Sequence, residues 1–122
     1  RIHHLLIGPG GLFALHTLYA RKAKVTVADP MVALGRRETY PLLRRVRSDA
    51  DRASYALTAE VRPVLVLVAP AAVSITASVR EVRVLRDTEV DGLRRSGGVL
   101  KPADVEALHA MARDRRVWLA AG

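Results

Sequence analysis

The sequence predicts a single mixed α/β domain, because it contains several short strand-like runs as well as amphipathic helical stretches. Half of its 122 residues are hydrophobic, which provides enough apolar material for a substantial core. It contains no internal repeat, low-complexity tract or linker. Residues 1–122 are therefore expected to form one domain.

The first part of the chain contains three candidate strands. Residues 2–7 (IHHLLI) form an apolar, β-prone run, which the glycines and proline of residues 8–11 (GPGG) end in a turn. Residues 12–17 (LFALHT) are compatible with a second strand or the start of a helix, since so short a run has no decisive periodicity. Residues 25–28 (VTVA) predict a strand that Asp29-Pro30 ends.

The clearest helix is predicted over residues 41–59. Its apolar residues recur at intervals of three and four and form one stripe: Leu43, Val46, Ala50, Ala53 and Leu57. Arg45 and Asp49, and likewise Arg47 and Asp51, are four residues apart. We expect both pairs on the exposed face of this helix.

The rest of the chain predicts further strands and two more helices. Three strands are expected, at residues 63–69, 73–76 and 81–85. Asp87 or Thr88 can cap a short helix that stops before Gly97-Gly98, and Pro102 opens a longer one. Residues 117–119 predict a short terminal strand.

The charge of the chain is strongly basic, with 20 lysines and arginines against 12 acids and a net charge of +8. Such a balance suits a polyanionic partner, either nucleic acid or an anionic membrane surface, although an arginine-rich composition alone would also produce it. The aromatic residues are scattered along the sequence, so we expect no stacking platform for single strands.

The absence of cysteine excludes disulfides and thiolate metal sites. The longest apolar run, residues 63–77, is shorter than the ~20 residues of a membrane helix, so no membrane insertion is expected. No signal-peptide pattern follows Arg1, and we expect a cytoplasmic protein.

The segment IHHLLIGPGGLFALHTL, residues 2–18, resembles the segment IDHLLIGPGGVFVIDTK of the nuclease-related (NERD) domain family, without a gap. The matching residues are Ile2, His4, Leu5, Ile7, Gly8, Pro9, Gly11, Phe13 and Thr17. The resemblance implies a restriction-endonuclease-like mixed sheet of about 5–6 strands flanked by 2–3 helices, with residues 12–17 as a strand. The family's first helix and strand have no counterpart here, so we expect the chain to begin inside a longer protein.

The resemblance also implies a magnesium site with acids at positions 3 and 16 and a lysine at position 18. This chain has His3, His16 and Leu18 instead. Imidazole is a poor magnesium ligand, and leucine can neither polarise a phosphate nor activate water. We therefore expect a degenerate, non-catalytic domain without a cofactor. His3 and His16 could still hold a transition metal and support a histidine-based nuclease, but ordinary polar residues are the simpler interpretation.

In a restriction-endonuclease-like fold the central helix flanks the DNA cleft. The candidate nucleic-acid-binding residues lie on and before this helix: Lys22, Lys24, Arg36, Arg37, Arg44, Arg45 and Arg47. The alternative is that they form only a solvated basic surface. The predicted function is thus a nucleic-acid-binding or regulatory module.

Two other functions remain open from the sequence. One is a protein-interaction or assembly subunit with a protein partner. The other is a dinucleotide-binding domain, since Gly8, Gly10 and Gly11 follow a strand and Asp29 ends the next one. That second function requires a helix over residues 12–20, whereas the family resemblance requires a strand.

Overall fold

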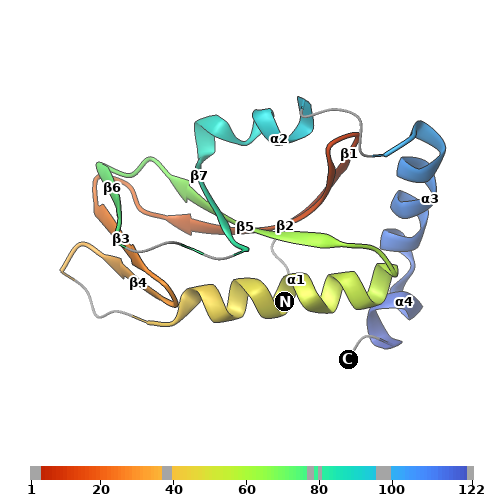
Figure 1. Cartoon of the computed structure of the whole chain (residues 1–122), viewed down its shortest axis with the longest axis horizontal. Coiled ribbons are helices and arrows are strands. Elements are labelled where there is room, and N and C mark those ends of the chain that lie inside the picture. The colour runs from red at the N-terminus through yellow and green to blue at the C-terminus, as the bar shows by residue number, and fades with distance from the viewer. Residues whose placement is uncertain (1–3, 37–39, 77–78, 80, 96–99, 121–122) are drawn as a thin grey trace.

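The structure is a computed structural model that describes residues 4–36, 40–76, 79, 81–95 and 100–120. Its described part contains two mixed β-sheets and four α-helices (Figure 1). The first sheet, in the order β1-β2-β5-β7, consists of β1 (His4–Gly8), β2 (Gly11–Tyr19), β5 (Val61–Val68) and β7 (Arg83–Arg86). The second, in the order β4-β3-β6, consists of β4 (Met31–Leu34), β3 (Lys24–Ala28) and β6 (Ala72–Ile75). The mixed α/β class predicted from the sequence is confirmed.

The helices are α1 (Leu42–Leu57), α2 (Asp91–Arg95), α3 (Pro102–Arg113) and α4 (Arg115–Ala120), with a 3-10 turn, η1 (Asp87–Glu89), before α2. The central helix and the strands at β1, β3, β5, β6 and β7 were predicted within a few residues of these bounds. The short strand β4 was not predicted. Gly97 and Gly98 lie outside the described residues.

The strand β2 settles the ambiguous segment after the first turn. It pairs antiparallel with β1, with Leu6 opposite Phe13 and Gly8 opposite Gly11. Gly11 has a φ of +124°, which a side chain would rarely adopt, so the turn requires glycine there. Residues 12–17 are thus a strand, and the helix that a dinucleotide-binding domain needs over residues 12–20 is not formed.

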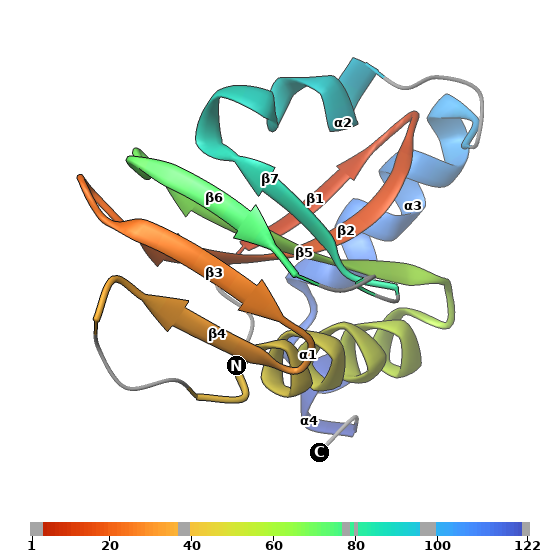
Figure 2. The same ribbon diagram turned by 60° about the vertical axis from the view of Figure 1, so that its left-hand side comes forward.

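The sequence was expected to form a single sheet, but the structure has two. The chain folds back after β2 and again after β5, and the two bends lie side by side because β2 and β5 are parallel neighbours. β2 turns into β3 and β5 turns into β6, and both pairs remain parallel neighbours. Lys22 and Ala69, one in each bend, have positive φ values of 61° and 50°. The amide of Lys22 donates to the carbonyl of Ala69 at 3.1 Å. Figure 2 shows β3, β4 and β6 as a layer of their own beside the first sheet.

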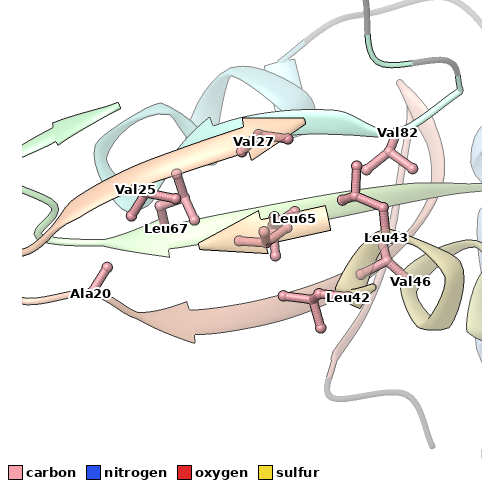
Figure 3. Close-up of a cluster of buried hydrophobic side chains, with 10 residues drawn as sticks. Ala20, Val25, Val27, Leu42, Leu43, Val46, Leu65, Leu67 and Val82 are labelled. Atoms are coloured by element: carbon pink, nitrogen blue, oxygen red, sulfur yellow. The ribbon is translucent and has the colours of Figure 1, made fainter. Parts of the chain in front are cut away.

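The largest part of the core lies between the two sheets and the first half of α1 (Figure 3). Val25 of β3 lies beside Leu67 of β5 in this view, and Leu43 of α1 reaches toward Leu65 and Val82. Leu43, Leu65 and Val25 are completely buried. Packing of this kind fixes α1 against β5 and holds the second sheet in place.

Each face of the first sheet is covered by a different set of helices. Leu12 and Ala14 of β2 pack against the second half of α1, where side chains of α3 and α4 also gather. Phe13, between them in sequence, points to the other face and packs with Leu93 of α2. β2 is therefore buried on both sides over this stretch.

The C-terminal segment differs from the prediction. Residues 117–119 were expected to form a strand, but they belong to the helix α4. Trp118 packs against the cluster that contains Leu12, and its indole Nε1 donates to the carbonyl of Ala112 at 2.8 Å. The segment thus covers α1 instead of adding to a sheet, and the two or three predicted helices become four. None of the helices in the described part of the chain has the length and apolar character needed to cross a membrane.

Candidate nucleic-acid interface

Two of the residues singled out from the sequence, His16 and Leu18, lie on the side of β2 that faces α1. Leu12 and Ala14 contact α1, and because strand residues alternate, His16 and Leu18 lie on the same face. Leu18 is half-buried and packs against the core cluster of Leu43 and Leu65. Leu18 therefore takes part in packing. His3 lies outside the described residues.

A buried carboxylate of α1 lies at the level of His16. Asp49 is only 9 % exposed, so its predicted place on the exposed face is wrong. Ala50 packs with Ala14, and Val46 belongs to the cluster that Leu18 packs against, which places Asp49 opposite the stretch of β2 around His16. The spacing of Asp49 three residues after Val46 could have revealed this position, because it falls on the apolar stripe.

A carboxylate and an imidazole are both possible ligands of a transition metal. A metal site needs more donors than these two. Within residues 4–36, 40–76, 79, 81–95 and 100–120, no group of three or more histidine, aspartate or glutamate side chains is placed to hold a metal ion. The proposed site at His3 and His16 includes a residue outside this part.

Arg47, one of the predicted phosphate contacts, forms an ion pair inside the protein. Its Nη1 donates to Oδ1 of Asp29 at 2.8 Å, and its Nη2 forms a second, shorter bond to Oδ2. The side chains of Arg47 and Asp29 are 24 % and 18 % exposed. The hydrogen bond to Asp29 raises the pKa of Arg47 above its ordinary value, and the carboxylate charge acts in the same direction. The charge of Arg47 is therefore already balanced.

The position of Asp29 comes from the end of β3. Its peptide bond to Pro30 is cis, and the carbonyl of Pro30 accepts a hydrogen bond from the amide of Leu43 at 3.2 Å. This contact brings the strand end to the first turns of α1. It explains why Arg47 pairs with an acid eighteen residues earlier in the chain.

Other predicted cations lie at the bends of the second sheet. The side chains of Lys22, Lys24 and Arg36 are exposed. They come together because the amide of Gly35, just before Arg36, donates to the carbonyl of Lys24 at 2.7 Å. Arg21, which was not singled out from the sequence, joins them from the bend after β2. We call these four residues, Arg21, Lys22, Lys24 and Arg36, the basic bend.

The central helix contributes a second pair of cations. Arg44 and Arg45 are exposed in the first half of α1. Among the described residues, the side chains of the basic bend and of Arg44 and Arg45 take part in no salt bridge. Arg37 lies outside the described residues. The structure thus divides the predicted cations into the basic bend, an exposed pair on α1, and the internally paired Arg47.

Comparison of the chain with protein-family models, with curated proteins and with solved structures gave no match.

Proposed function

We propose that this chain is a nuclease-related domain that has lost its metal-dependent cutting site and binds nucleic acid through exposed cations. The observation that carries the proposal is that six exposed cations at the bends of the second sheet and on the first half of α1 have no acidic partner within the described structure, namely the basic bend together with Arg44 and Arg45. Such side chains are available to replace the counterions of a phosphate backbone. The restriction-endonuclease-like relationship belongs to this proposal and rests on the segment of residues 2–18.

The proposed loss of catalysis rests on two side chains of β2. Leu18 supplies no charge where the resemblance implies a lysine, and it packs against the core. His16 supplies an imidazole where an acid is implied, which removes a hard oxygen ligand for magnesium. What remains is a scaffold with a basic surface, suited to binding a polyanion without cutting it.

Binding to duplex DNA tests the proposal directly. We expect a labelled duplex to bind the chain at moderate salt, with an affinity that falls steeply as salt rises, because phosphate contacts release counterions. Fluorescence anisotropy over a series of salt concentrations measures both quantities. Undetectable binding to duplex DNA and RNA at moderate salt would refute this function. Self-association under the same conditions, measured by light scattering, would then favour the assembly function.

A plasmid-nicking assay tests the loss of catalysis. We expect no nicking above background in magnesium, manganese or zinc, because neither Leu18 nor His16 can replace the implied lysine and acid. The His16→Ala variant should behave as the unmodified chain does. Nicking that depends on one metal and disappears in His16→Ala would instead establish a histidine-based nuclease.

A further inference from the structure

One surface hollow combines an aromatic ring with two arginines of the basic bend. It has a volume of about 550 Å³ and lies where β2 and β4 end. Tyr19, Arg21 and Arg36 line it, and Ala23 and Leu34 add apolar surface. Its size lies within the roughly 300–1,000 Å³ of small-ligand sites.

We propose that this hollow binds an unpaired nucleotide of a nucleic-acid strand, with the base stacked on Tyr19 and the phosphates held by Arg21 and Arg36. The inference rests on the proposed nucleic-acid function and specifies its substrate class, a single strand or an unpaired end. It also revises the expectation that the scattered aromatic residues provide no stacking platform for single strands, since one exposed tyrosine beside two arginines is enough to stack a single base.

Tyr19 is the aromatic side chain best placed for stacking. It is the last residue of β2 and is 76 % exposed, although it is surrounded in sequence by half-buried and buried residues. Ala20, directly after it, is 1 % exposed and belongs to the main core cluster. The backbone that carries the ring is thus anchored while the ring itself is open to a ligand. Anchoring of this kind lowers the entropy lost on binding.

The two arginines are held by the bends that form the hollow. The amide of Ala23 donates to the carbonyl of Ala20 at 2.9 Å and closes a turn with Arg21 inside it. Lys22, the third residue of this turn, has a positive φ of 61°, as type II turns require. Arg36 follows Gly35, whose φ of 62° and bond to Lys24 define the end of the β3–β4 hairpin. The guanidinium groups therefore come from two separate, hydrogen-bonded bends.

This combination suits an unpaired nucleotide better than a base pair inside a duplex. Stacking requires access to the face of a base, which neighbouring pairs cover in a continuous duplex. Guanidinium groups bind phosphate oxygens in a two-pronged geometry. The apolar surface of Leu34 and Ala23 can cover the edge of a base or a sugar.

The test compares a fluorescein-labelled oligothymidine with a blunt-ended, fully paired DNA duplex by anisotropy. Tyr19→Ala should weaken oligothymidine binding about tenfold, since one stacked base is lost, and leave duplex binding unchanged. Tyr19→Phe should retain the affinity because the ring remains. Tyr55→Ala removes a tyrosine of similar exposure, 70 %, from α1 and should change neither affinity. Arg21→Ala and Arg36→Ala should each reduce the salt slope for the oligothymidine by about 0.7.

The outcomes separate this inference from the function on which it rests. If Tyr19→Ala binds oligothymidine as tightly as the unmodified chain, or weakens duplex binding equally, the stacking site is refuted while nucleic-acid binding stands. If neither probe binds the unmodified chain, the proposed function itself fails. AMP is expected to compete only far above the concentration of the strand, because it lacks neighbouring phosphates. Competition by AMP at equal concentration would overturn the strand as ligand and assign the hollow to free nucleotides.

Discussion

Replacing five exposed cations by glutamine, namely Lys22, Lys24, Arg36, Arg44 and Arg45, is expected to weaken duplex DNA binding more than a hundredfold at low salt. Six phosphate contacts, those of the basic bend and of Arg44 and Arg45, correspond to a slope of about −5.4 in the logarithm of affinity against that of salt concentration. The unmodified chain should therefore lose about 2,000-fold in affinity between about 50 and 200 mM salt. The variant keeps Arg21 and should retain a slope of only about −0.9.

A control variant with the same net charge shows whether DNA binding depends on these particular cations or only on the total charge of the protein. Five other exposed cations lie on β7, α3 and their neighbouring segments: Arg83, Arg86, Lys101, Arg113 and Arg115. Their replacement by glutamine lowers the net charge equally, and we expect it to reduce affinity less than tenfold through the long-range field alone. Equal losses in the two variants would show that binding depends on total charge, which contradicts the proposed surface.

Arg47→Ala is expected to destabilise the fold by about 2 kcal/mol, between the values typical of exposed and of fully buried ion pairs. For a domain of this size such a loss lowers the melting temperature by roughly 8 °C. The reason is that Asp29 would lose both of its guanidinium hydrogen bonds while remaining largely buried. Duplex DNA affinity should not change, because the charge of Arg47 is balanced inside the protein.

Arg45→Ala provides the matched comparison on the same helix. Arg45 is exposed, so its loss should leave the free energy of unfolding within about 0.5 kcal/mol and weaken DNA binding. Combining Arg47→Ala with Asp29→Ala should recover part of the lost stability, since no charge then remains without its partner. The two single variants and the double variant form a double-mutant cycle, in which chemical denaturation measures the coupling free energy between Arg47 and Asp29. A coupling free energy near zero would contradict the structural role of this ion pair.

The direction of the pKa shift of Arg47 defines the pH range over which its ion pair with Asp29 stabilises the fold. The folded protein raises the pKa of Arg47. For a base with a raised pKa, the stabilising contribution is fully present below the ordinary pKa and is lost as the pH rises through the folded value. For arginine this loss falls in strongly alkaline solution. The guanidinium side of the pair therefore contributes equally across the neutral range.

Much of the secondary structure followed from local sequence patterns. The apolar stripe from Leu43 to Leu57 corresponds to α1, and the valine-rich run of residues 63–69 corresponds to β5. The short strand β4 was not predicted, because its four residues, Met31–Leu34, lie between Pro30 and Gly35, which favour a loop. The final segment was predicted as a strand because Val117 and Trp118 suit a strand locally, but they pack as a helix against α1.

The candidate site was harder to predict from the sequence than the secondary structure, because it depends on contacts between segments that are far apart in the chain. Tyr19 and Arg36 are seventeen positions apart in sequence, and the two bends bring them to one hollow. Local spacing placed Asp49 on an exposed face with Arg45, whereas packing of α1 over β2 buries it. A pattern of charges on a helix cannot distinguish these cases, because burial depends on what covers the helix.

By itself, the sequence determined the α/β class, the first strand with the turn after it, the central helix and the basic character of this protein. These properties depend on neighbouring residues: hydrophobic periodicity, turn-forming glycines and net charge. Only the tertiary structure decided that the strands divide into two sheets, that Arg47 is paired with Asp29, and that Tyr19 shares a hollow with Arg21 and Arg36. The physical reason lies in the two bends at Lys22 and Ala69, where positive φ values let the chain fold back after β2 and after β5. β2 and β5 are far apart in sequence, so only their pairing in the folded protein determines which side chains meet at these bends.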